Sequence, residues 1–328
     1  MVEVRRRRPW LRAGIVVGLL LVAGVAGLYE GRAIYGGSGP SAEARAVLVP
    51  RGGDADVARA LRDAGVIDDV TAFRAAALAT RSQGPLHAGE LLFPARASIA
   101  DVLLILRGAR PVQHRVTIPE GLTAAQISRV LDRADALTGD GVVPAEGALL
   151  PETYIFERGA SRASIASRAR TAMTRALAQA WASRTAGLPL SDPGQLLVLA
   201  SMVERETAKP DERAHVAGVF VNRLRAGMRL QSDPTVIYAV GGGLGPLERG
   251  LTHADLSWPN PYNTYTVPGL PAGPIASPGL ASLAAVAKPD VTDDLYFVAD
   301  GSGGHAFAKT LGEHQRNVAR WRAVPAAP

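Results

Sequence analysis

The sequence contains no cysteine among its 328 residues. Disulfide frameworks, thiolate zinc sites, iron–sulfur clusters and a cysteine nucleophile are therefore excluded. Excess charge is also scarce over most of the chain. The formal net charge is +6, and the five arginines among the first twelve residues, set against Glu3, account for +4 of it. Only +2 remains for all later residues, which argues against a nucleic-acid-binding protein.

Metal and cofactor motifs are equally scarce. His305 and His314 are nine residues apart, and no carboxylate stands at ligand spacing from them, so we expect no metal site. The glycine-rich segment Asp300–Gly304 (DGSGG) resembles a phosphate-binding loop in composition only, because it lacks the lysine and the helix that should follow. We therefore expect no bound cofactor.

Hydrophobic residues make up 47% of the chain, enough for one large domain or two or three ordinary ones. The long apolar run covers residues 13–29, where 17 residues carry no charge, and it follows the basic tail at residues 1–12. This pattern predicts a single transmembrane anchor, with a cleaved signal peptide as the alternative. In both cases the basic side stays in the cytoplasm and the remaining chain lies outside it.

The chain after this run divides by composition. Residues 30–45 are rich in glycine and serine and predict a flexible linker. Residues 46–112 combine two short apolar runs with helix-capping residues and predict a small α+β subdomain. A strand at 113–118 opens the remainder, 113–328, where helical spacing predominates and a larger mixed α/β domain is expected.

One helix of the larger domain carries two glutamates. Asp192 and Pro193 predict its start, and Pro210 predicts its end at about Lys209. Glu204 and Glu206 are separated by about 200° around a helix axis, so they cannot share a face. Glu206 ends the most apolar stripe, and a carboxyl against such a surface keeps its proton near neutral pH, as a general acid must. The alternative is that Glu206 is exposed at the end of the helix and pairs with a neighbouring basic side chain.

A long proline-rich loop follows. Residues 258–279 contain six prolines and three glycines around an aromatic and amide cluster. Such a stiff loop fits a sugar-binding cleft, because tyrosine rings stack on pyranose rings while amides bond to hydroxyls. We expect Gln231, Tyr262, Asn263 and Tyr265 to contact substrate, with core or loop packing as the alternative for each.

Ordered motifs of the C-terminal half resemble the YceG-like endolytic murein lytic transglycosylases. They cover about residues 195–321 densely, and weaker matches lie at 119–121 and 150–154. The dense motifs are 199–207 (LASMVERET), 219–224 (VFVNRL), 228–238 (MRLQSDPTVIY), 262–265 (YNTY), 269–275 (GLPAGPI) and 295–307 (LYFVADGSGGHAF). This chain departs from the family at Ala272, where a second proline is common.

The resemblance implies an α+β protein with a membrane anchor, a LysM-like subdomain over 46–112 and a catalytic transglycosylase domain over 113–328. Glu206, which precedes Thr207, matches the catalytic acid of the family. The implied reaction cleaves the β-1,4 bond between N-acetylmuramic acid and N-acetylglucosamine in peptidoglycan and leaves 1,6-anhydro ends. Cell-wall synthesis proteins are candidate partners, and the implied location is the bacterial cytoplasmic membrane, with the catalytic domain outside the cytoplasm.

Two other functions stay open at this point. A muramidase-type hydrolase would use Asp233 as its second carboxylate, although the position before Pro234 also fits a turn residue. A non-catalytic, membrane-tethered wall-binding or division scaffold would have no use for a desolvated carboxyl at Glu206. His305 is a further candidate substrate contact, and its alternative role is to bond to the backbone of the glycine-rich turn.

Overall fold

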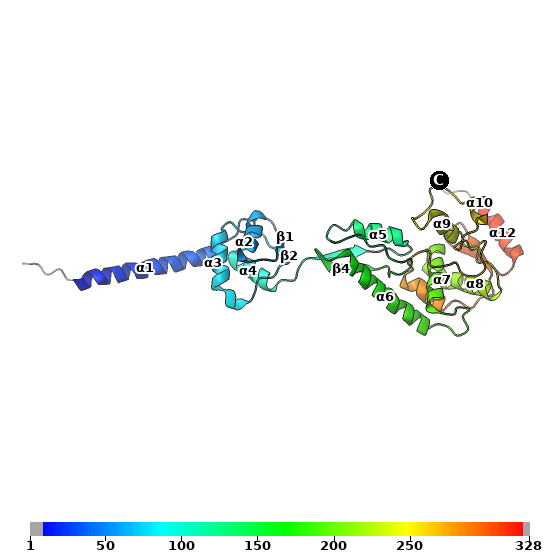
Figure 1. Ribbon diagram of the computed structural model, residues 1–328, viewed down its shortest axis with the longest axis horizontal. Coiled ribbons are helices and arrows are strands. Elements are labelled where there is room, and N and C mark those ends of the chain that lie inside the picture. Colours follow the sequence, from blue (N-terminus) through cyan, green and yellow to red (C-terminus); the bar gives the residue numbers. More distant parts are fainter. Residues whose placement is uncertain (1–8, 324–328) are drawn as a thin grey trace, which may run out of the picture. The chain divides into compact units, whose positions relative to one another are not determined.

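The structure, a computed structural model, describes residues 9–323, with side chains from residue 18 onward. The chain forms two compact units, Met1–His114 and Arg115–Pro328, and Figure 1 labels many of their elements. The described residues contain three two-stranded sheets among helices, which makes the chain a mixed α+β protein. The division at His114 lies two residues after the end of the predicted subdomain, 46–112.

The first helix, α1 (Pro9–Gly36), contains the predicted anchor at 13–29 and extends into the predicted linker. Its described side chains form an apolar run over 18–29 that ends at Glu30, whereas a membrane span needs about 20 predominantly apolar residues. Within the described part of the chain, no helix combines the length and the apolar character that a membrane crossing requires. The predicted transmembrane anchor is therefore wrong for that part, and the side chains of the basic tail, 1–12, lie outside it.

The N-terminal unit is organised around an antiparallel pair of strands, β1 (Arg45–Val49) and β2 (Gly89–Phe93). Successive side chains of a strand point to opposite faces, so Val47 and Val49 face the core while Leu48 is exposed. Three helices and one short turn complete this unit: α2 (Asp54–Asp63), α3 (Val70–Ala79), η1 (Arg81–Gln83) and α4 (Ile99–Gly108). Its LysM-like character stays a prediction.

The C-terminal unit has two hydrophobic cores. The first is formed by the paired strands β3 (Gln113–Thr117) and β4 (Thr153–Glu157) with α5 (Ala124–Asp132) and α6 (Arg162–Ala182). The second core is centred on α7 (Pro193–Glu206), which packs against α8 and α11. These two partners span Arg213–Arg225 and Leu280–Ala287.

Local sequence explains where α7 begins and which face it buries. The carboxylate of Asp192 accepts a 3.0 Å hydrogen bond from the backbone N–H of Gln195, and Pro193 occupies the first helical position. The apolar stripe that leads to Glu206 is buried in the core: Val198, Leu199, Met202 and Val203. This stripe fixes the rotation of α7 and therefore the direction in which its last side chain points.

The remaining elements surround the C-terminal end of α7. The antiparallel strands β5 (Tyr296–Ala299) and β6 (His305–Ala308) pack against the last helix, α12 (Leu311–Arg322). A capping box between Thr310 and Glu313 starts α12. Three short elements complete the unit: η2 (Pro210–Glu212), α9 (Asp233–Gly241) and α10 (His253–Ser257).

Candidate active site

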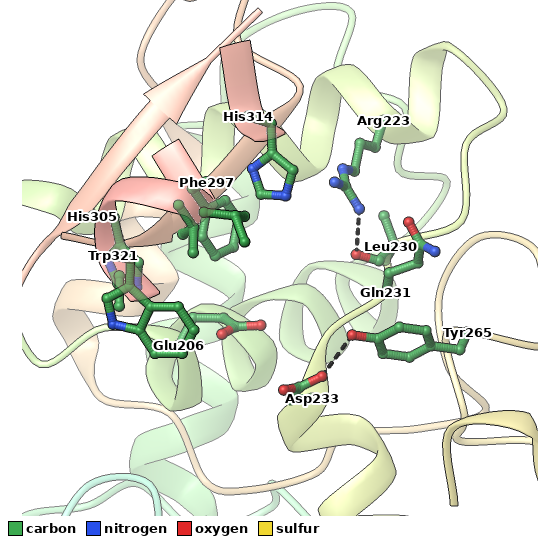
Figure 2. A pocket seen from close by; sticks show the side chains of 13 residues that line it. Glu206, Arg223, Leu230, Gln231, Asp233, Tyr265, Phe297, His305, His314 and Trp321 are labelled. Carbon is green, nitrogen blue, oxygen red and sulfur yellow. Dashed lines mark hydrogen bonds between the residues drawn. The ribbon is translucent and has the colours of Figure 1, made fainter. Parts of the chain in front are cut away.

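A cleft of about 490 Å³ opens at the C-terminal end of α7. Segments distant in the sequence contribute to it, namely α7, α8, the start of α9, the proline-rich loop, β5, β6 and α12. Figure 2 shows their side chains around the open space. The lining residues are Glu206, Arg223, Leu230, Gln231, Asp233, Tyr265, Phe297, Val298, Ala299, His305, His314, Val318 and Trp321.

Glu206 is the last residue of α7, and its carboxyl lies in this cleft. Burial raises the pKa of Glu206 to about 7, and the charge of Asp233 acts in the same direction. A 2.6 Å hydrogen bond from Ser232 Oγ to Glu206 Oε1 opposes the rise, as do the charges of His305 and Arg223. A carboxyl with a pKa near 7 can both donate and accept a proton at neutral pH.

Glu204 has a different environment and does not line the cleft. Its Oε2 accepts hydrogen bonds from the backbone N–H of Gly279 at 2.9 Å and from Ser282 Oγ at 2.8 Å. Its Oε1 lies 3.9 Å from Nη2 of Arg213, and the side chain is 5% exposed. Glu204 therefore joins α7 to the first turn of α11, while Glu206 faces the cleft, as the helical spacing of the two residues predicts.

Three predicted substrate contacts, Gln231, Asp233 and Tyr265, line the cleft. The hydroxyl of Tyr265 donates a 2.6 Å hydrogen bond to Oδ1 of Asp233 (Figure 2). Burial and this bond raise the pKa of Tyr265, so its hydroxyl stays protonated. Gln231 is exposed and has a φ of 52°, in the left-handed region. Such a conformation is strained for a residue other than glycine and is typical of functional sites.

The other two predicted contacts in the proline-rich loop, Tyr262 and Asn263, do not line the cleft. Tyr262 packs on the second core, with its ring centroid 4.9 Å from that of Tyr238. Asn263 is fully buried, and its Oδ1 accepts from the backbone N–H of Tyr265 at 2.9 Å. Its Nδ2 donates to the backbone carbonyls of Asp255, Leu256 and Trp258. These contacts hold the loop that carries Tyr265.

His305 is the first residue of β6 and lines the cleft. Its ring Nδ1 lies 2.7 Å from Oε2 of Glu212, and its backbone N–H donates to Oε1 of the same carboxylate at 3.1 Å. The glycine-rich turn obtains its backbone contacts elsewhere, because Asp300 Oδ1 accepts from the N–H groups of Ser302 and Gly304. The His305 ring therefore does not serve that turn.

The family model described as the YceG-like family matches residues 47–320. The chain belongs to the YceG-like family. The resemblance that its motifs carry is thereby confirmed. Among solved structures, the crystal structure of a YceG-like protein from Listeria monocytogenes is similar, with 29% identity and a TM-score of 0.52, and the match covers 84% of this chain and 99% of that one.

Two relatives are named endolytic murein transglycosylase. The protein of Bacillus subtilis is 38% identical over 173 residues, which is 53% of this chain and 47% of the relative. The protein of Streptococcus pneumoniae is 30% identical over 253 residues, which is 64% of this chain and 45% of the relative. The chain thus spans a little under half the length of these relatives.

The cleft also contains residues that the sequence did not identify as part of a site, above all Arg223. Its Nε donates to the carbonyl of Leu295 at 2.6 Å, and its Nη1 donates to the carbonyl of Leu230 at 2.9 Å. Arg223, in one of the family motifs, thereby ties α8 to the residue before β5 and to the loop before α9. In the part of the chain that the structure describes, no three His, Asp or Glu side chains are grouped to hold a metal ion.

Ser232 and Trp321 are two further site residues that sequence patterns did not reveal. Ser232 is buried, and the short hydrogen bond to Glu206 joins residues 26 positions apart. Trp321 is 44% exposed at the end of α12 and lines the cleft together with His314 and Val318. The spacing of these three residues, i, i+4 and i+7, places them on one helix face, and this was the signal available in the sequence.

Proposed function

We propose that this chain is an endolytic lytic transglycosylase that cuts peptidoglycan strands between N-acetylmuramic acid and N-acetylglucosamine. The observation that carries the proposal is Glu206, a carboxyl whose pKa is raised to about 7 in a cleft of aromatic and polar side chains. The names of the Bacillus and Streptococcus relatives support the same reaction. Because peptidoglycan lies outside the bacterial cytoplasm, we also propose an extracytoplasmic site of action for the C-terminal unit.

The proposed reaction needs one group that acts first as an acid and then as a base. Protonated Glu206 gives its proton to the glycosidic oxygen while the bond from that oxygen to C1 of the muramic residue breaks. The Glu206 carboxylate then takes the proton of the C6 hydroxyl of that residue, and the C6 oxygen bonds to C1 to close a 1,6-anhydro ring. The proton of Glu206 is restored, and no water is consumed.

A hydrolase is the main alternative, and it would need Asp233 as a second carboxylate across the sugar. Asp233 lines the same cleft, but its Oδ1 accepts the 2.6 Å hydrogen bond from Tyr265. This bond ties the carboxylate to the proline-rich loop and supports a positioning role. The single-carboxylate mechanism is therefore favoured.

A non-catalytic wall-binding scaffold is the second alternative. Holding a carboxyl where burial disfavours its charge makes the fold less stable above neutral pH, and a binding module gains nothing from this. The environment of Glu206 therefore supports a catalytic function over a purely binding one. For the N-terminal unit, we propose that it helps to bind glycan and takes no part in the chemistry.

Mass spectrometry of the fragments released from purified peptidoglycan tests the reaction. We expect wild-type protein to release fragments that end in 1,6-anhydro-N-acetylmuramic acid. Replacing a general acid costs about 10²- to 10⁴-fold in rate, so Glu206→Gln should abolish these products. Glu157→Gln, at an exposed position on β4, is the matched control. Reducing N-acetylmuramic acid ends would show that water is the nucleophile and would return Asp233 to consideration.

A further inference from the structure

Glu212 holds His305 at two points. One carboxylate oxygen lies 2.7 Å from the ring Nδ1 and the other accepts the backbone N–H of the same residue at 3.1 Å. Both side chains are 14% exposed. A β-carbon at Gly304 would come against Oε1 of Glu212 and Nζ of Lys209, so both side chains lie close over the backbone of this glycine. The contact is therefore a closely fitted one between η2 and the start of β6.

The same carboxylate is linked to the residue after the proposed acid. Thr207 directly follows Glu206, and its hydroxyl donates to Oε2 of Glu212 at 3.2 Å. The hydroxyl of Thr207 also accepts the backbone N–H of Lys209 at 3.1 Å. Glu212 thus fixes the position of His305 relative to the end of α7, where Glu206 lies.

The contact also requires a hydrogen on one particular ring nitrogen of His305. Burial alone would raise the pKa of Glu212, but the contacts with His305 and Thr207 together outweigh it and the pKa is lowered, so Glu212 is ionised at neutral pH. A carboxylate only accepts hydrogen bonds, which means that Nδ1 bears the hydrogen. Nε2 then has no hydrogen-bond partner among the described residues, in a side chain that lines the cleft. The ring of Phe297 packs edge-on against the imidazole at 5.3 Å and limits its rotation.

We propose that Glu212 is a positioning residue, which holds His305 so that Nε2 forms a hydrogen bond with a polar group of the glycan beside Glu206. This inference rests on the proposed function. Glu212 itself does not line the cleft and acts only through His305. Mutating a carboxylate that orients a metal-binding histidine typically lowers metal affinity or activity about tenfold to a hundredfold. A similar loss of activity is expected on replacing Glu212.

A double-mutant cycle in the full chain tests the proposal, with release of fragments from purified peptidoglycan as the assay. Glu212→Gln and His305→Ala should each lower kcat/KM by about tenfold to a hundredfold. If Glu212 acts through His305, the double variant should be no worse than His305→Ala alone. Glu248→Gln, at an exposed glutamate, is the control and should match wild type. A further loss in the double variant, or wild-type activity in Glu212→Gln, would overturn the inference.

Nitrogen NMR of the histidine rings gives a second measurement, which needs no activity. Wild-type His305 should show hydrogen on Nδ1, and the Nε2 resonance should shift when a soluble N-acetylglucosamine tetramer is added. A wild-type ring with hydrogen on Nε2 alone refutes the proposal, even if Glu212→Gln fails to fold. An active Glu206→Gln protein would refute the proposed function instead, so the two failures are distinguishable.

Discussion

The hydroxyl of Ser232 donates a 2.6 Å hydrogen bond to Oε1 of Glu206. Ser232 is itself held, because its backbone N–H donates to Thr264 Oγ1 at 3.0 Å, and Thr264 Oγ1 lies 2.8 Å from Thr235 Oγ1. A donor to a carboxylate favours its ionised form, so Ser232 offsets part of the effect of burial. Opposing contributions thus set the pKa of Glu206, and that of Ser232 can be removed without changing the others.

Ser232→Ala should move the alkaline limb of the pH profile to higher pH. The acid must be protonated to act, so wild-type kcat/KM should fall as pH rises through about 7. Without the Ser232 hydroxyl the pKa of Glu206 rises further, and the protein should keep its activity to a higher pH. Measuring kcat/KM from pH 5 to pH 9 checks this.

The control for this measurement is Ser302→Ala, which removes an exposed hydroxyl from the glycine-rich turn. Its alkaline limb should coincide with that of wild type. A Ser232→Ala limb at unchanged or lower pH would mean that Ser232 does not tune the acid.

Glu206→Gln should stabilise the protein at alkaline pH. Between pH 4.5 and about 7 the folded state binds a proton at Glu206 that the unfolded state has lost, so wild-type stability falls as pH rises. The glutamine variant lacks this contribution and should gain up to about 3 kcal/mol in its free energy of unfolding at pH 8, at 1.36 kcal/mol per pKa unit. Urea denaturation at pH 4 and pH 8 gives the test, and equal pH dependence of the two proteins would contradict it.

Glu204→Gln should affect stability and leave the chemistry largely intact. The substitution keeps the shape of a side chain that binds Gly279 and Ser282 but removes the charge that faces Arg213. We expect a loss of about 1–3 kcal/mol in the free energy of unfolding, with nearly wild-type activity per folded molecule. Thermal unfolding and the peptidoglycan assay, run on the same samples, separate the two effects. An inactive but fully stable Glu204→Gln protein would overturn the assignment of the acid.

The sequence was informative where the determinants are local. Asp192 and Pro193 mark the start of α7 in the sequence as in the structure, and the period of its apolar stripe is sufficient to predict which glutamate faces the cleft. Both features depend on residues within two or three turns of one helix. The α+β class follows in the same way from alternating short strands and capped helices.

Features that depend on distant pairs were not predictable. The bond between Ser232 and Glu206 spans 26 residues, and that between Arg223 and Leu295 spans 72. Asn263 illustrates the same point: an amide in an aromatic loop predicts a sugar contact, whereas the structure buries this side chain against backbone carbonyls. Only the folded chain decides whether a polar side chain serves the loop or the cleft.

Trp321 offers the sharpest test of where the glycan lies. It is 44% exposed, an unusual setting for so large an apolar ring, and it lines the cleft at the end of the helix face that carries His314 and Val318. An exposed indole in a sugar cleft can stack on a pyranose ring. Trp321→Ala should therefore raise KM for soluble glycan strands by about tenfold, with little change in kcat.

Trp258→Ala is the matched control, because Trp258 is also 44% exposed but does not line the cleft. It should leave both constants unchanged, and Trp321→Phe should recover most of the lost affinity by restoring an aromatic face. Intrinsic fluorescence adds an independent readout, since a blue shift on glycan binding should persist in Trp258→Ala and vanish in Trp321→Phe. If Trp321→Ala lowers kcat and leaves KM unchanged, Trp321 shapes the environment of Glu206 and does not bind a sugar ring.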